Sequence, residues 1–208
     1  MTSVWGPLGW MTLHSMASLY PDEPTGSEKA LMNSWLDLFA ATITCPSCQG
    51  HFQETLEVYR SRFPGMLESR AAFLLFTFRA HNSVNQRLQK PIYSTVAQCF
   101  EVLRNNVKTR TATNYRQAYY AHITRHWKVL QDASGMAALR KIADMNKIEA
   151  TYALARSDDF IELIPEGLTM IGKLEPPPEG IRPRSMMPPS PLPNQKIGIQ
   201  GGRFRLRK

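Results

Sequence analysis

The stretch Cys45-Pro46-Ser47-Cys48, followed directly by Gln49-Gly50-His51-Phe52, is the part of the sequence around which the chain is organised. Two thiols separated by two residues can close into a disulfide and reopen by exchange. Pro46 suits the first turn of a helix, because it has no backbone N–H to leave unpaired there. Cys48 would then lie in the opening turn, where free N–H groups and the helix dipole favour a thiolate. The spacing therefore suits a redox-active disulfide.

Zinc is the alternative partner of the two thiols. Cys45 and Cys48 with His51 and His81 would make a Cys2His2 set, which zinc accepts, although the Cys-x2-Cys-x2-His spacing is tighter than usual for zinc. A c-type haem would need a histidine directly after the second cysteine, where Gln49 stands. An iron–sulfur cluster would need more thiolates. From the spacing alone, the redox and zinc interpretations both stay open.

The 208-residue chain has a globular composition and a basic C-terminal half. Its three cysteines are too few for a disulfide framework. No apolar run of about 18 residues predicts a transmembrane helix. The N-terminus lacks the blocks of a signal peptide, so we expect a cytosolic protein. Residues 1–104 carry eight basic and eight acidic side chains, whereas residues 105–208 carry 17 basic and nine acidic ones. We therefore expect the chemistry in the neutral half of the chain.

Helical periodicity recurs along the chain, and no segment shows the strong alternation of a strand. The pattern predicts an all-α fold that starts with a four- or five-helix bundle over residues 1–107. We predict that its helices begin near Pro7, after an N-cap at Ser27, in the Cys45–Cys48 motif, near Ser69 and after an N-cap at Ser94.

Two further parts follow the bundle. Amphipathic segments at 114–131 and 135–156 predict a helical extension, which we place at 108–174. Residues 175–208 are rich in proline and predict an extended basic tail, because such a segment cannot hold a helix. Tyr115, Tyr119 and Trp127 form an aromatic stripe that would pack on the bundle or against a second subunit. The tail would tether the protein to an anionic partner, nucleic acid or capsid, or simply keep it soluble.

Polar side chains lie on helix stripes that are otherwise apolar. His81 and Asn85 are one turn apart on a strongly apolar predicted helix, and an unpaired buried polar group costs about 1–3 kcal/mol. A ligand with several donors and acceptors would satisfy them. Trp10 and His14 share one face of the first predicted helix and suit the same ligand, although each alone is typical of an ordinary core. Cys99 is expected to be a small buried apolar side chain, or else to form an intermolecular disulfide.

Three blocks of sequence together resemble the Erv/ALR family of flavin-linked sulfhydryl oxidases. They are the opening from Trp5-Gly6-Pro7 through Trp10 and His14 to Tyr20-Pro21, the Cys45–Cys48 motif with His51-Phe52, and His81-Asn82-Ser83-Val84-Asn85 with Leu88, Lys90-Pro91 and Tyr93. The blocks stand in family order, with family-like spacing, over about residues 5–103. The short opening is most similar to that of members encoded by large DNA viruses.

The resemblance implies an FAD-dependent sulfhydryl oxidase that forms disulfides from dithiols while O2 is reduced to H2O2. Cys48 would lie nearest the flavin, and Cys45 would exchange with the substrate thiol, with no metal involved. The residues expected to form the FAD site are Trp10, His14, Tyr20, His51, His81, Asn82, Val84, Asn85, Lys90 and Tyr93. The competing interpretation is a zinc-binding helical module with a nucleic-acid-binding tail.

The chain departs from the family pattern in a few places. It has no second, shuttle C-x-x-C, so a dithiol protein would reach Cys45 directly or through a thioredoxin-like relay protein. Only Cys99 is left where many relatives have a structural disulfide. Pro7 stands where cellular relatives have an arginine, so a phosphate contact would have to come from Arg79, Arg87 or Lys90. The resemblance also implies a homodimer and, for a viral member, a place in the host cytoplasm or the virion.

Overall fold

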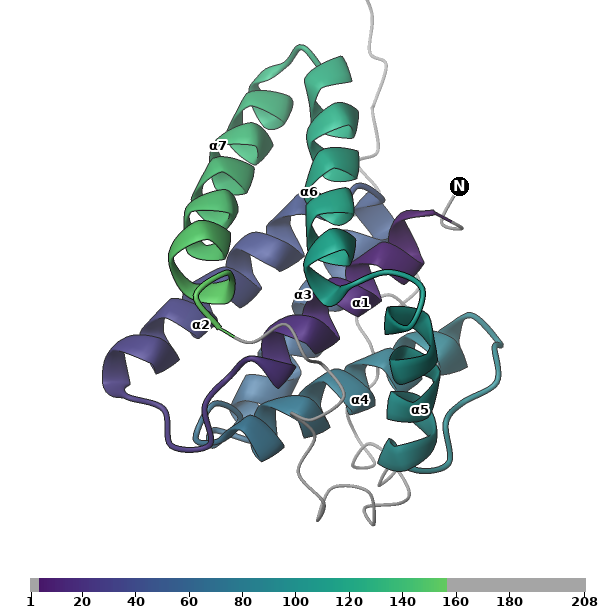
Figure 1. The fold of residues 1–208 in the computed structure, drawn as a ribbon. Coiled ribbons are helices and arrows are strands. Elements are labelled where there is room, and N and C mark those ends of the chain that lie inside the picture. Colours follow the sequence, from purple (N-terminus) through teal and green to yellow (C-terminus); the bar gives the residue numbers. More distant parts are fainter. Residues whose placement is uncertain (1–3, 157–208) are drawn as a thin grey trace, which may run out of the picture. The chain divides into compact units, whose positions relative to one another are not determined.

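The structure is a computed structural model that describes residues 4–156, and within this range it consists of helices and the turns between them. The predicted Pro-rich tail lies outside the described residues. The helices are α1 (Trp5–Ser18), α2 (Gly26–Thr42), α3 (Pro46–Arg62), α4 (Arg70–Arg87), α5 (Val96–Val107), α6 (Ala112–Val129) and α7 (Ala133–Ile148), which continues into a π-helical turn, η1 (Glu149–Ala153) (Figure 1). The prediction of an all-α fold is confirmed. None of the described helices is both long and apolar enough to cross a membrane.

Polar side chains at the N-caps explain where most of these helices begin. Helices α3 and α4 begin where predicted, with Cys45 and Ser69 as their N-caps, but the predicted caps of α2 and α5 are wrong. Thr25, not Ser27, caps α2, because Thr25 and Glu28 form a reciprocal capping box. Thr95, not Ser94, caps α5 and accepts the N–H of Gln98 at 3.1 Å.

Helix α1 is at the centre of the packing, since it contacts both α4 and α6, while α2 contacts α3 and α7 (Figure 1). Its side chains are buried from Met11 to Ser18. Helix α4 is also largely buried, and α5 packs against it. The core therefore joins helices from both ends of the described range.

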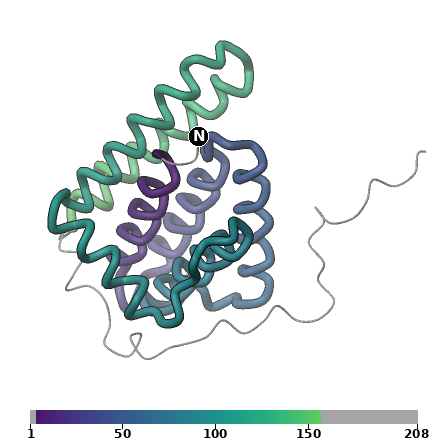
Figure 2. Tube along the Cα trace, turned by 90° about the vertical axis from the view of Figure 1, so that its right-hand side faces the viewer, coloured from purple at the N-terminus to yellow at the C-terminus, as the bar shows by residue number. Residues whose placement is uncertain are grey.

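Helices α6 and α7 lie side by side and pack onto the bundle (Figures 1 and 2). Tyr119 is fully buried, with its ring 5.4 Å from that of Phe39 on α2. The indole N–H of Trp127 donates to the carbonyl oxygen of Thr42 at 2.9 Å. The aromatic stripe thus packs against the bundle of its own chain. The predicted boundary at residue 107, between the bundle and the helical extension, stays a prediction. Helices α6 and α7 share the core of the bundle.

A buried ion pair connects α6 with η1, and the same arginine contacts α1. The guanidinium of Arg116 on α6 donates to both carboxylate oxygens of Glu149, at 2.9 and 3.0 Å, and another of its nitrogens donates to Ser15 on α1. The two charged side chains are 1% and 7% exposed. These contacts connect α6 with η1 and with α1. Removing either charged partner would be strongly destabilising, because it would leave the other charge buried and unpaired.

Candidate functional site

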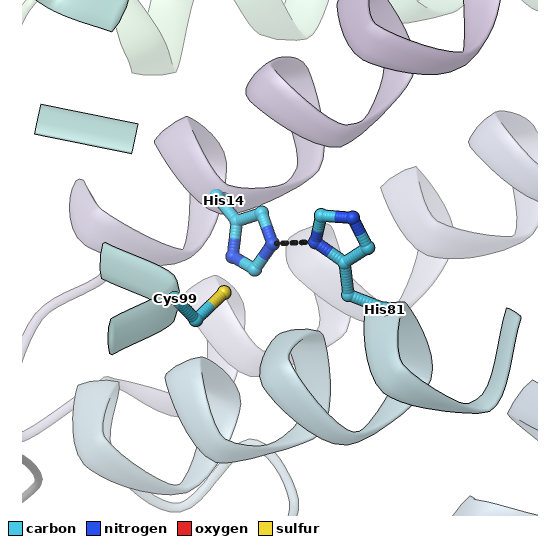
Figure 3. Close-up of side chains that lie close together, drawn as sticks. All are labelled: His14, His81 and Cys99. Atoms are coloured by element: carbon cyan, nitrogen blue, oxygen red, sulfur yellow. Dashed lines mark hydrogen bonds between the residues drawn. The ribbon is translucent and has the colours of Figure 1, made fainter. Parts of the chain in front are cut away.

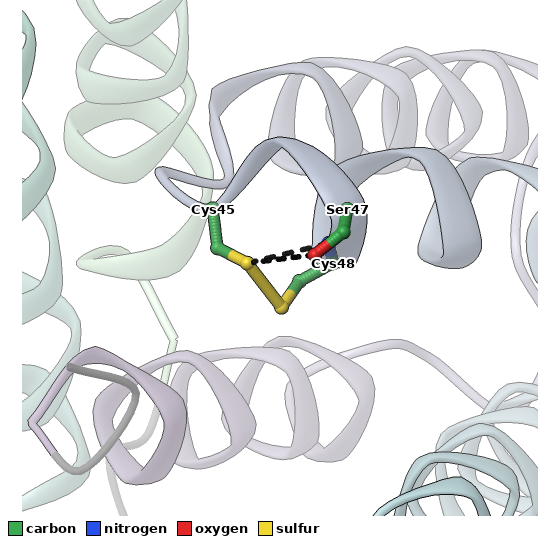
Figure 4. Close-up of a disulfide and its surroundings, with 3 residues drawn as sticks. All are labelled: Cys45, Ser47 and Cys48. Carbon is green, nitrogen blue, oxygen red and sulfur yellow. Dashed lines mark hydrogen bonds between the residues drawn. A yellow bond between two sulfur atoms is a disulfide. The ribbon is translucent and has the colours of Figure 1, made fainter.

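The two cysteines of the central motif form a disulfide at the N-terminus of α3 (Figure 4). Cys45 is the N-cap, and Pro46 takes the first helical position, as its missing N–H favours. The backbone N–H of Cys48 points at the Cys45 sulfur, 3.4 Å away, and the Ser47 hydroxyl lies at the same distance from it. The N-terminal end of a helix stabilises negative charge, so it favours a thiolate at either sulfur after reduction.

A cavity of about 460 Å³ adjoins the disulfide on the Cys48 side. This volume is within the usual range for small-molecule sites. Cys48 contributes to its wall, whereas Cys45 does not. Most of the wall is apolar or aromatic and comes from α1, α2, α3, α4, α5 and the segment between α4 and α5, through residues that include Trp5, Phe39, Phe52, Pro91 and Leu103. The two sulfurs therefore face different surroundings, one a cavity and the other not.

The structure brings seven of the predicted site residues to this cavity. They are Trp10, Cys48, His81, Val84, Asn85, Lys90 and Tyr93. Five others do not line it: Cys45, His14, Tyr20, His51 and Asn82. These five residues make other contacts.

Asn82 is fully buried and holds the segment that follows α4. Its side chain accepts the N–H of Tyr93 at 2.9 Å and donates to the Tyr93 carbonyl at 2.8 Å. Asn85 donates in the same way to the carbonyl of Pro91, at 3.3 Å. Gln89 has a φ of 54°, the left-handed conformation that ends a helix and turns the chain back. The two asparagines thus fix the wall formed by Pro91 and Tyr93.

His14 lies behind this wall. Its Nε2 is 3.1 Å from His81 Nδ1, a hydrogen-bond distance (Figure 3). The His81 ring stacks on Trp10, with centroids 4.1 Å apart and an angle of 10° between the planes. This is contact distance, so no ligand ring fits between them. Burial lowers the pKa of His81 to about 4, helped by the charge of Lys90. Burial also places the pKa of His14 well below its usual range, helped by His81. Both rings are therefore neutral at pH 7.

Tyr20 and His51 lie away from the cavity wall. The Tyr20 hydroxyl donates to the carbonyl of Leu67 at 2.9 Å, and its ring packs edge-on against Phe73, so Tyr20 belongs to the core. His51 is half-buried on α3 near Thr55. Its pKa is lowered first by burial and then by the positive charge of Arg87. His51 therefore lies close enough to Arg87, a cavity residue, for the charge of Arg87 to lower its pKa, although His51 does not line the cavity itself.

Cationic and polar groups at the cavity include some that the sequence did not single out. Of the three cations suggested for a phosphate, Arg87 and Lys90 line the cavity, whereas Arg79 hydrogen-bonds the Tyr59 hydroxyl elsewhere. Asn106 on α5 also lines it and was missed. Its place three residues after the buried Leu103, on the same helix face, could have revealed it.

The predicted zinc set of Cys45, Cys48, His51 and His81 is not supported. The two sulfurs are bonded to each other, and His81 pairs with His14. Within residues 4–156, the possible metal ligands that do lie together are His14, His81 and Cys99. A second hollow of about 670 Å³ follows α6 and α7, but it has no cysteine in its wall. We therefore place the candidate site at the Cys48 cavity.

The part of the chain that forms the Cys48 cavity is similar to known proteins. Residues 8–118 match the model of the Erv1/Alr family. The FAD-linked sulfhydryl oxidase ERV2 of Saccharomyces cerevisiae is 33% identical over 88 residues, which are 42% of this chain and 43% of that protein. A putative FAD-linked sulfhydryl oxidase of Invertebrate iridescent virus 3 is 33% identical over 88 residues, with 58% of its length covered. An FAD-linked sulfhydryl oxidase of African swine fever virus is 36% identical over 90 residues, which are 43% of this chain and 72% of the viral protein.

Among solved structures, the yeast Erv1 core is similar to 45% of this chain and 75% of its own, at 31% identity and a TM-score of 0.40. The chain thus spans about half the length of the first two relatives and nearly three quarters of the African swine fever virus protein.

Proposed function

Because the chain belongs to the Erv1/Alr family, we propose that it is an FAD-linked sulfhydryl oxidase that forms disulfides in proteins and reduces O2 to H2O2. The observation that carries the proposal is the disulfide at a helix N-terminus with one sulfur, Cys48, in the wall of a ligand-sized cavity. The thiol donor is a dithiol protein or a thioredoxin-like relay protein.

The chemistry of the cavity wall fits FAD. Flat aromatic side chains and aliphatic groups suit the ring systems, and the side chains of His81, Asn85 and Asn106 suit polar atoms. Arg87 and Lys90 supply positive charge for a diphosphate. When bound, FAD accepts the two electrons of the reduced cysteine pair and passes them to O2.

Cys45 is the sulfur that exchanges with substrate in this proposal. A substrate thiolate attacks Cys45 Sγ, a mixed disulfide forms, the Cys45–Cys48 bond breaks and Cys48 leaves as a thiolate. The first turn of α3 stabilises this leaving group. A second substrate thiolate then attacks the substrate sulfur of the mixed disulfide. The substrate leaves oxidised, and Cys45 becomes a thiolate close to the N–H of Cys48. Two electrons now reside on the cysteine pair.

The test is the visible spectrum of the purified protein before and after addition of dithiothreitol in air, with oxygen uptake recorded. We expect a flavin absorbance that bleaches and recovers while oxygen is consumed. Cys45→Ser and Cys48→Ser should each abolish turnover but retain the flavin. Gln53→Ala, on an exposed position of the same helix, is the control and should retain turnover.

The separate roles of the two sulfurs can be tested with a bulky aromatic disulfide reagent. Cys45 in the Cys48→Ser variant should react faster than Cys48 in the Cys45→Ser variant. Cys48 lies in the wall of the cavity, where the bound flavin would cover it, whereas Cys45 does not line the cavity. Equal rates would contradict the assignment. A colourless protein that consumes no oxygen would overturn the proposed function itself.

A further inference from the structure

A cluster of three buried side chains lies behind the cavity wall, with His14 from α1, His81 from α4 and Cys99 from α5 (Figure 3). Their potential ligand atoms all lie within 4.8 Å of one another. His14 Nδ1 is buried and has no hydrogen-bond partner in the described part of the chain. Figure 3 shows the Cys99 sulfur on the side of the His14 ring that carries this nitrogen. A polar atom without a partner therefore faces a thiol.

The hydrogen bond between the two rings can hold its proton in two ways. A neutral imidazole has one donor and one acceptor nitrogen. If His14 Nε2–H donates, His14 Nδ1 has a free lone pair and His81 Nε2 carries a proton. If His81 Nδ1–H donates instead, His14 Nδ1 carries an unpaired proton and His81 Nε2 is bare. The two arrangements leave opposite groups at His81 Nε2, which Figure 3 shows pointing away from His14. His81 is one of the residues that line the cavity.

The surroundings of His14 favour the first arrangement. A buried N–H without an acceptor is rarer in native proteins than an under-satisfied acceptor. Burial raises the pKa of the Cys99 thiol to about 12, so the sulfur keeps its proton. The thiol lies near His14 without a hydrogen bond to Nδ1 in this structure, and it is a donor that a small side-chain movement would direct at the nitrogen lone pair. A protonated Nδ1 would find only a sulfur atom, which is a weak acceptor. The arrangement with a bare His14 Nδ1 leaves no unpaired N–H on the fully buried His14 ring and places the free ring proton at His81 Nε2.

We propose that Cys99 and His14 position the proton of His81, so that His81 presents Nε2–H to the cavity as a hydrogen-bond donor. Cys99 does not line the cavity and acts only through His14, which makes it a positioning residue. The ligand must then offer an acceptor at this point of the wall. A phosphate, hydroxyl or ring acceptor of FAD meets this requirement, and to that extent the inference rests on the proposed function.

A metal ion is the competing occupant of the same cluster. Histidine ligands of metals usually donate their second ring nitrogen to a partner, and His14 has none for its Nδ1 in the described residues. The nitrogens also already bond to each other. These two facts favour a hydrogen-bonded cluster without metal.

The experiment measures which ring nitrogens carry protons. The full-length protein as purified, labelled with ¹⁵N in its histidines, is studied at neutral pH by two-dimensional ¹H–¹⁵N spectra of the imidazole rings. Single substitutions of His51, His122 and His126 assign the other three rings. We expect His14 and His81 to be protonated at Nε2 and bare at Nδ1. A His81 ring protonated at Nδ1 would overturn the proposal.

Two substitutions then test the role of Cys99. Cys99→Val removes the donor at similar volume and should shift the His14 Nδ1 resonance and populate the second tautomer. Cys99→Ser keeps a donor and should retain the wild-type tautomers. If the valine variant does not fold, Cys99→Ala takes its place. Unchanged resonances in the variant without a donor would exclude Cys99 from the mechanism.

Metal and flavin contents separate the remaining explanations. Zinc bound at one equivalent and lost in Cys99→Val would overturn the proposal in favour of a metal site. The expected tautomers in a protein without flavin would support this inference while the proposed function fails. Flavin and oxidase turnover together with the opposite tautomers would leave the proposed function intact and overturn the inference.

Discussion

Asn82 is fully buried, and both polar ends of its side chain are bonded to the backbone of Tyr93. It occupies a position that the resemblance assigns to cofactor binding, yet it does not line the cavity. Its contribution is to hold the chain after α4 against α4, so that Pro91 and Tyr93 form a wall. A single side chain thus connects helix termination with the shape of the site.

We predict that Asn82→Ala destabilises the protein by about 1–3 kcal/mol, because the part-buried N–H and carbonyl of Tyr93 lose their partners. It should also reduce the amount of flavin that copurifies. Urea denaturation and the flavin-to-protein absorbance ratio measure the two effects. Gln86→Ala, at an exposed position of the same helix, is the control. Wild-type flavin content in Asn82→Ala would contradict the role of this side chain.

The buried histidine pair predicts sensitivity to acid. The unfolded state binds protons at His81 near its usual pKa of about 6.5, whereas the folded state does so only near pH 4. The contribution of His81 to stability is therefore fully present above about pH 6.5 and is lost as the pH drops from there to about 4, by about 3 kcal/mol. His14 acts in the same direction, because its pKa is lowered as well.

The measurement is the free energy of unfolding against pH for the wild type and for His81→Gln. The difference between the two curves isolates His81 from the carboxylates that titrate in the same range. We expect the variant to lose less stability between pH 6.5 and 4. Parallel curves would show that His81 does not have the lowered pKa.

The candidate site was predictable from sequence only in part, for reasons seen at single residues. His81 and Asn85 stood out because a polar stripe on an apolar helix needs partners. Tyr20 shares the motif but bonds to Leu67, which is 47 residues away in the chain, and no local pattern reveals such a contact. Asn106 was missed because a single polar residue late in a helix looks like part of an exposed face.

At the scale of elements, the turn between α6 and α7 depends on Gly135. A Cβ at this position would lie 2.0 Å from the carbonyl oxygen of Leu130 and 2.8 Å from that of Trp127. Both are backbone atoms, so they cannot move aside as the end of a flexible side chain does. Asp132 caps α7 there and accepts the N–H of Gly135 at 2.8 Å. The close approach of the two helices requires a residue without a side chain.

We therefore predict that Gly135→Ala lowers the free energy of unfolding and the melting temperature, because the turn has to open. Gly50 on α3 gives a matched contrast, since its Cβ would meet nothing within 4 Å. Gly50→Ala should stabilise the protein by up to about 1 kcal/mol, as expected in a helix interior. Thermal melts followed by circular dichroism compare the two. A stable Gly135→Ala variant would contradict the tight turn.

Helix positions were predictable because the periodicity is local, whereas two helix starts were not. Ser27 and Ser94 are good caps in isolation. At α2, Glu28 completes a capping box only with Thr25, and this moves the start to Gly26. At α5, the backbone N–H of Ser94 donates to the side chain of Gln98, and Thr95 takes the cap. A choice between neighbouring hydroxyls depends on which reciprocal partner lies three or four residues on.

For the molecule as a whole, the question is whether residues 1–107 fold without α6 and α7. Tyr119 lies against Phe39 and close to Gly9, and Arg116 reaches Ser15 on α1. Side chains of both helices are buried, among them Ile123, Ile142 and Met145. A chain cut at residue 107 would expose these contacts on α1 and α2 to water.

We predict that a chain ending at residue 107 unfolds at a much lower temperature than a chain ending at residue 156 or the full-length protein, or that it aggregates. The reason is that burial of one large apolar side chain contributes about 1.5–3 kcal/mol, and total stabilities are only about 5–15 kcal/mol. Losing several such side chains therefore removes most of the stability. Melting curves and flavin content of the three chains measure the effect. If the shortest chain melted cooperatively near the full-length temperature and kept its flavin, residues 1–107 would be an independent domain, and α6 and α7 would be an addition that the redox site does not need.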